Sequence, residues 1–67
     1  MRFTIFIFSN PSNSLIRELK NFTKEECIRK CSYALSFNSL KELEEAFNNQ
    51  DIILDSDFDY IRIIEEK

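Results

Sequence analysis

The residues that could do chemistry in this chain gather near its C-terminal end. Asp55, Asp57 and Asp59 alternate along the chain, and Glu66 stands at the twelfth position counted from Asp55. This spacing superficially matches a calcium-binding loop, in which oxygen ligands alternate and a glutamate closes the site. Tyr60, however, holds the position where such a loop needs glycine for its sharp turn. We therefore predict a solvated acidic turn there and no metal site.

The two cysteines are the next candidates for metal or nucleophilic chemistry. A structural zinc ion needs four ligands, mostly Cys or His, and the chain offers only Cys27, Cys31 and no His. Arg29 and Lys30 stand next to Cys31, but sequence neighbours often point apart, so a reactive thiol is not expected. Both cysteines are predicted to be small buried residues in the reduced form that is usual in the cytosol.

Carboxylates are plentiful, but the sequence places none of them for general acid or base catalysis. A catalytic carboxyl needs a pKa moved by burial or by a close partner, and the acidic residues here occur in runs typical of solvated surface. No His is available as a base. We therefore expect a protein that is not an enzyme and that uses no cofactor.

The net charge of −3 is unevenly distributed. Residues 1–41 hold seven Lys and Arg against three acidic residues, whereas residues 42–67 hold two against nine. Such an acidic block argues against nucleic acid as a partner, because a basic face supplies most of that affinity. The acidic residues Asp51, Asp55, Asp57 and Asp59 instead suit a partner with a basic surface, or else serve solubility and protect a sheet edge.

Sixty-seven residues predict one small domain, 1–67. Seven Phe, nine Ile and six Leu supply a generous core, and because Gly is absent, turns must be made by Asn, Asp, Ser or Pro. The apolar run at residues 2–8 is too short for a signal peptide, and no run approaches the length of a membrane span. We predict a cytoplasmic protein with no membrane partner.

Two capping boxes mark helix starts. Thr23-x-x-Glu26 interrupts the helical apolar spacing that runs from residue 15 to residue 22, so the first helix should break or kink there. Ser39-x-x-Glu42 begins a second helix, which Asn48–Asn49 can end in a left-handed cap.

Strands are predicted at residues 2–8, 52–54 and 58–64, with a hairpin turn at 55–57. Residues 31–37 fit either a one-sided strand or a continuing helix, and we favour the strand because three serines and a tyrosine are poor interior helix formers. The fold class is therefore α+β: a small mixed sheet of three or four strands packed with two helices, in the order β-α-β-α-β-β. The alternative order is β-α-α-α-β-β.

The first strand is apolar on both faces, and this feature directs the functional prediction. Its odd-numbered residues point to one face, and Phe6 and Phe8 point to the other. If a loop or the segment after Thr23 covers the second face, these side chains are only core. Two helices can cover only one face, however, so we predict that Phe6, Phe8 and Tyr60 form an exposed aromatic patch.

These features predict a small, acidic, non-enzymatic binding protein. It would inhibit or neutralise a larger protein by occupying its surface, as small inhibitors, antitoxins and phage counter-defence proteins do. The predicted partner-binding residues are Phe6, Phe8, Tyr60, Asp51, Asp55, Asp57 and Asp59. The alternative is a structural or assembly module, acting as a homo-oligomer such as a homodimer or as a subunit of a complex.

Overall fold

A computed structural model describes residues 1–66 as a three-stranded antiparallel sheet with helices on both faces. The strand order is β2-β1-β3, with β1 antiparallel to both neighbours. The strands are β1 (Arg2–Phe8), β2 (Tyr33–Phe37) and β3 (Tyr60–Glu66). The predicted α+β class is confirmed, but the sheet is purely antiparallel and not mixed.

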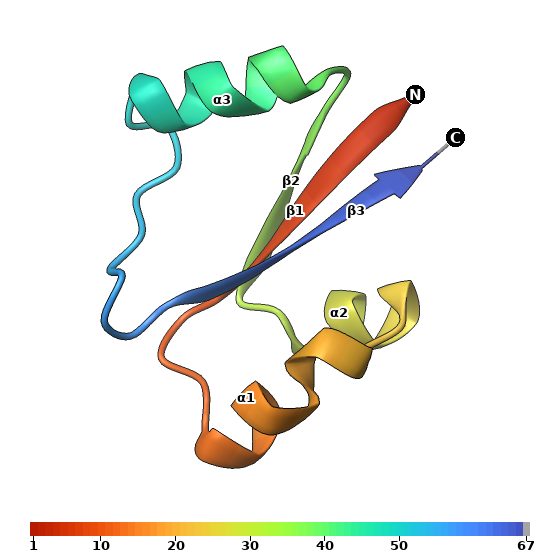
Figure 1. Cartoon of the computed structure of the whole chain (residues 1–67), viewed down its shortest axis with the longest axis vertical. Helices are drawn as coiled ribbons and strands as arrows, with labels where there is room; N and C mark the ends of the chain where they lie inside the picture. Colours follow the sequence, from red (N-terminus) through yellow and green to blue (C-terminus); the bar gives the residue numbers. More distant parts are fainter. Residues whose placement is uncertain (67) are drawn as a thin grey trace.

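The helices form two separate covers. The first consists of α1 (Asn13–Glu18), the short 3-10 turn η1 (Leu19–Asn21) and α2 (Lys24–Lys30), and the second is α3 (Leu40–Asn48). Figure 1 shows α3 on one side of the sheet and α1 with α2 on the other. The chain is thus a thin three-layer structure, in the order β-α-α-β-α-β once η1 is set aside.

The predicted break at Thr23 is confirmed and has a clear local cause. The Thr23 side chain accepts a hydrogen bond from the Glu26 backbone N–H at 3.2 Å, and the Glu26 carboxylate accepts one from the Thr23 backbone N–H at 3.1 Å. The bond from the Thr23 backbone is the main reason that the pKa of Glu26 is lowered. This reciprocal cap starts a new helix at Lys24, so the chain turns back over the sheet.

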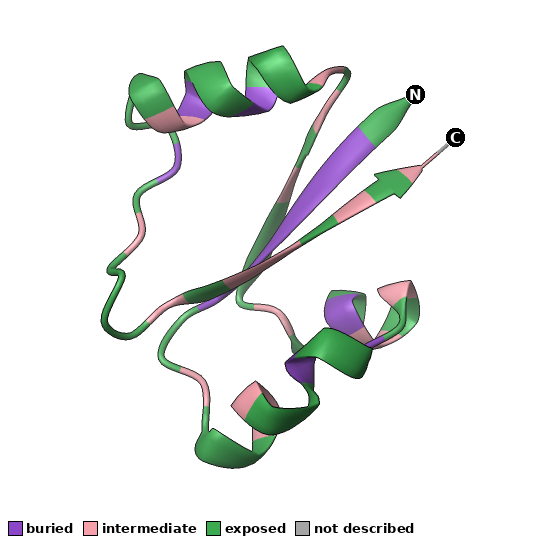
Figure 2. Ribbon diagram, in the orientation of Figure 1, coloured by how far each residue is buried: buried purple, intermediate pink, exposed green. Residues whose placement is uncertain are grey.

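Both faces of β1 are buried, which overturns the prediction of an uncovered face. Phe3, Ile5 and Ile7 pack against α3, while Phe6 and Phe8 pack against the α1–α2 cover. Figure 2 shows buried residues running along β1 and the flanking strands more exposed. The expectation failed because it placed both helices on one face, whereas the α1–α2 cover and α3 pack on opposite faces of the sheet (Figure 1).

Residues 52–54 are not a strand, so the predicted C-terminal hairpin is wrong. This segment follows α3 without regular secondary structure, buries Ile52 and partly buries Leu54 against the α3 side of the core, and turns Ile53 outward. The apolar run is therefore explained by packing and not by strand pairing. The last strand begins at Tyr60, two residues later than predicted. The strand at residues 31–37 is confirmed as β2.

The end of α3 differs in detail from the prediction. Asn49 has φ −86°, and it is Gln50 that adopts the left-handed conformation, with φ 63°. The backbone N–H of Asp51 donates to the Ala46 carbonyl at 2.8 Å, and that of Gln50 donates to the Phe47 carbonyl at 3.2 Å. This is a Schellman motif, and Gln50 holds the position where helices usually place glycine.

Gln50→Gly is therefore expected to raise the free energy of unfolding by about 0.5–1 kcal/mol, because it relieves the left-handed strain at some cost in backbone entropy. Chemical denaturation followed by circular dichroism measures the change. Asn49→Gly is the matched control and should lower stability, because Asn49 already has a negative φ. Equal effects of the two glycines would contradict this account of the cap.

Among residues 1–66, no helix has the length and apolarity needed to cross a bilayer.

Candidate functional site

The predicted partner-binding residues fall into two groups in the structure. Phe6 and Phe8 are only 2 % and 1 % exposed, so their assignment to an accessible patch is wrong. Asp51, Asp55 and Asp57 are exposed, Asp59 is half-buried, and Tyr60 is 40 % exposed. The accessible part of the prediction is therefore the segment that connects α3 to β3. We call residues 51–59 the acidic loop.

Hydrogen bonds within the acidic loop give it a defined shape. The Asp59 carboxylate accepts from the backbone N–H of Asp55 at 3.0 Å and from that of Asn10 at 3.2 Å. The Asp55 carboxylate accepts from the Asp57 N–H at 3.0 Å, and the Asp55 carbonyl accepts from the Asp59 N–H at 2.7 Å. Asp59 thus ties the acidic loop to the turn that follows β1, where Asn10 has φ 46°.

Large apolar side chains are exposed in and beside this same loop. Ile53 is 74 % exposed and Phe58 is 56 % exposed, and Tyr60 follows directly at the start of β3. Sequence reasoning missed Ile53 and Phe58 because it assigned both to strands. The signal that could have found Phe58 was its position between Asp57 and Asp59, in a turn too polar to bury it.

The uneven charge of the sequence becomes a separation across the sheet. Five of the nine basic residues lie on the α1–η1–α2 cover: Arg17, Lys20, Lys24, Arg29 and Lys30. Seven of the twelve acidic residues lie on α3 and the acidic loop: Glu42, Glu44, Glu45, Asp51, Asp55, Asp57 and Asp59. The acidic loop therefore belongs to the negative side of the molecule.

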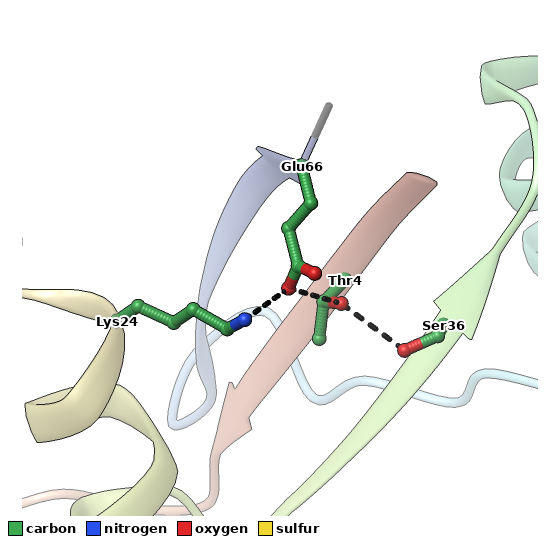
Figure 3. Close-up of polar contacts among 4 residues, drawn as sticks. All are labelled: Thr4, Lys24, Ser36 and Glu66. Carbon is green, nitrogen blue, oxygen red and sulfur yellow. Dashed lines mark hydrogen bonds and ion pairs between the residues drawn. The ribbon is translucent and has the colours of Figure 1, made fainter. Parts of the chain in front are cut away.

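A second polar cluster crosses the three strands near the chain ends (Figure 3). Lys24 Nζ lies 2.7 Å from Glu66 Oε1, and the Thr4 hydroxyl lies 3.1 Å from that of Ser36 and 3.5 Å from Glu66 Oε1. Because an ionised Glu66 can only accept, Thr4 donates toward it and Ser36 donates to Thr4. These hydrogen bonds give the buried Thr4 hydroxyl its partners, and the Lys24–Glu66 ion pair links α2 to β3.

The Lys24–Glu66 pair makes a testable prediction about pH. The hydrogen bond from Lys24 is the main cause that lowers the pKa of Glu66. The stabilisation from this group is therefore present above the ordinary glutamate pKa and is lost as pH falls through the lowered one. Lys24→Met should raise the pKa of Glu66, measured by NMR titration of its carboxyl carbon, and should reduce stability at neutral pH but not in acid.

Lys41→Met is the control for that titration, since it removes the same charge at an exposed site at the start of α3. It should leave the pKa of Glu66 unchanged. A Glu66 that titrates alike in all three proteins would show that the ion pair does not form in solution.

The cysteines have structural environments. Cys27 is the fully buried residue of α2 and belongs to the cluster that holds Phe6, Phe8 and Phe22. This burial raises the pKa of its thiol. Cys31, which ends α2, is half-buried, and both thiols are free. The prediction of a small buried residue is confirmed for Cys27 and holds only in part for Cys31.

Comparison with models of known protein families, with curated proteins and with solved structures found no match to this chain. Within residues 1–66, no pocket is detected and no three potential ligands lie close enough together to hold a metal ion. Function is therefore argued from the exposed side chains of this chain, and the most distinctive set is the acidic loop with Ile53, Phe58 and Tyr60.

Proposed function

We propose that this chain is a non-enzymatic binding protein whose acidic loop, together with Tyr60, docks on a basic surface of a larger protein. It would act by occupying that surface, as an inhibitor, an antitoxin or a phage counter-defence protein does. The observation that carries the proposal is the exposure of Ile53, Phe58 and Tyr60 within a segment that also holds four aspartates.

The combination of side chains supports a protein partner. Aromatic residues are enriched in the central, desolvated parts of interfaces, where a few of them supply most of the affinity. Phe58 and Tyr60 are exposed and are separated by one residue, Asp59, whose carboxylate is held by two backbone N–H groups. A shaped loop loses less conformational freedom on binding than a free one, so more of its contact energy remains as affinity.

The charge of the loop supports a basic partner. Asp51, Asp55 and Asp57 are exposed and can approach lysines or arginines of another protein without first leaving a buried site. Such complementary charge increases the association rate and suppresses partners of the wrong sign. The α1–α2 cover carries the opposite charge, so only the acidic side of the molecule suits such a surface.

The test is affinity capture with tagged chain, comparing proteins retained by the wild type with those retained by Asp55→Lys/Asp57→Lys and by Phe58→Ala. A true partner is lost with both variants, and the wild type retains less of it as the salt concentration rises, because salt screens the attraction between the acidic loop and a basic surface. Phe58 suits this test because its side chain lies at the surface, so its removal leaves the core intact.

Two controls match these variants. Glu44→Lys/Glu45→Lys makes the same charge change on exposed positions of α3, and Leu40→Ala truncates an apolar side chain that is 52 % exposed. Both should retain the partner. A partner that survives Asp55→Lys/Asp57→Lys, or that is lost equally with Glu44→Lys/Glu45→Lys, would refute the acidic loop as the docking surface.

A further inference from the structure

We propose that β2 pairs edge to edge with β2 of a second copy of this chain, forming a symmetric dimer. The pairing would join two three-stranded sheets into one antiparallel sheet of six strands, ordered β3-β1-β2-β2-β1-β3. This inference does not depend on the proposed function, because it uses the opposite edge of the sheet from the acidic loop.

The free edge of β2 has none of the features that normally keep sheet edges apart. Natural edge strands are protected by charged residues, especially lysine, by proline, by bulges or by a covering element. The ten residues from Cys31 to Leu40 carry no charge and no proline. Tyr33, Ala34 and Ser36 of β2 are exposed, and among residues 1–66 the strand pairs only with β1, so its outer edge is open.

The other edge is protected, which makes β2 the choice for pairing. β3 carries Arg62, Glu65 and Glu66, and its Glu66 is already engaged by Lys24. The acidic loop leads directly into β3, so an antiparallel pair of β3 strands would set the acidic loop of one copy beside Glu65 and Glu66 of the other. Pairing through β2 leaves the β3 strands at the two outer ends of the combined sheet, where their charges are far apart.

The sequence of β2 is complementary to itself in an antiparallel pair. With the two-fold axis at Leu35, Tyr33 stands opposite Phe37 of the second copy, and Ala34 stands opposite Ser36. Aromatic cross-strand pairs are among the more favourable in antiparallel sheets, and small residues opposite one another allow close approach. The second copy therefore fits this strand without any like-charge contact.

The accessible surface is consistent with one further buried interface. The chain exposes 4849 Å² for a mass of 8.0 kDa, whereas a folded monomer of this mass exposes about 4,450 Å². Burying the difference of about 400 Å² on each copy would give an interface of about 800 Å² in total, below the roughly 1,200–2,000 Å² of stable complexes. The expected dimer is therefore weak and depends on concentration.

Sedimentation velocity of the purified chain, from micromolar to near-millimolar concentration, tests the proposal. The apparent mass should rise from the 8.0 kDa of one chain toward twice that value. Ala34→Lys/Ser36→Lys sets lysines directly opposite one another across the axis and should weaken dimerisation roughly tenfold or more. Ala34→Glu/Ser36→Glu should do the same.

Mixing the lysine and glutamate variants should restore a dimer, because opposite charges then face each other across the axis. Ser14→Lys/Asn48→Lys, at two exposed positions away from β2, is the charge control and should sediment as the wild type does. Ala34→Lys alone keeps the Ser36 hydroxyl contact with Thr4 and guards against loss of folding. A wild type that stays monomeric throughout, or variants that do not associate when mixed, would overturn the proposal.

Discussion

Phe8→Ala is expected to lower the free energy of unfolding by about 3–5 kcal/mol, the usual cost of removing a buried aromatic side chain. Phe8 is 1 % exposed and its ring centroid lies 6.2 Å from that of Phe22 in the α1–α2 cover. At roughly 0.05–0.15 kcal/mol per residue, a chain of 67 residues has only about 3–10 kcal/mol of stability, so this loss removes a large share of it. Urea denaturation followed by circular dichroism measures the loss.

Phe58→Ala is the control for this effect, since it removes the same side chain from an exposed position. Its stability should stay within about 0.5 kcal/mol of the wild type, as for most surface substitutions. The two variants therefore compare a phenylalanine of the core, Phe8, with one at the surface, Phe58. Similar losses in both variants would mean that the α1–α2 cover does not pack on β1 as described.

Asp59→Ala is expected to lower the free energy of unfolding by about 1–2 kcal/mol. Its half-buried carboxylate accepts two backbone hydrogen bonds, from Asn10 and from Asp55, and bonds to a charged acceptor are stronger than neutral ones. The loss should also appear as faster amide hydrogen exchange at those two N–H groups, which NMR resolves residue by residue.

Asp57→Ala is the matched control for the loop. In the part of the chain that the structure describes, Asp57 contributes its backbone N–H to the hydrogen bonds of the turn, but its carboxylate makes no hydrogen bond there. This carboxylate can therefore be removed with little effect on stability. If Asp57→Ala destabilised the chain as much as Asp59→Ala, the loss would not come from the two hydrogen bonds that the Asp59 carboxylate accepts.

Local signals in the sequence were sufficient to predict much of the fold. Both capping signals start helices as predicted, although only half of the second capping box forms, because the Glu42 carboxylate accepts from the Asn38 N–H and not from that of Ser39. The alternation at residues 31–37 marks β2. These features depend on neighbours three or four residues apart, or on a period of two, so they can be recognised without tertiary information. The class α+β followed from them.

What could not be predicted depends on contacts between distant residues. An apolar strand such as β1 shows that both faces are suited to burial, but the sequence does not say how many covers the helices will form. The apolar run at residues 52–54 packs Ile52 and Leu54 on the core without strand pairing, and hydrophobicity alone does not distinguish this from a strand. Both errors came from counting elements without placing them.

The exposed part of the candidate site was predicted only in part for the same reason. The four aspartates were recognised because charge is a local property, and Tyr60 because the predicted strand at residues 58–64 placed it on the face opposite Ile61 and Ile63. Phe6 and Phe8 were misplaced, and Ile53 and Phe58 were missed, because burial is decided by which surfaces meet in the folded chain.

The separation of charge across the sheet makes this small molecule an electric dipole. A basic protein attracts the side formed by α3 and the acidic loop and repels the α1–α2 cover, so the molecule is rotated while it is still diffusing toward contact. If the chain binds as we propose, encounters begin with the acidic loop already facing the basic surface, and a larger fraction of collisions is productive. Association should for this reason slow as ionic strength rises, even where the final complex rests mainly on Phe58 and Tyr60.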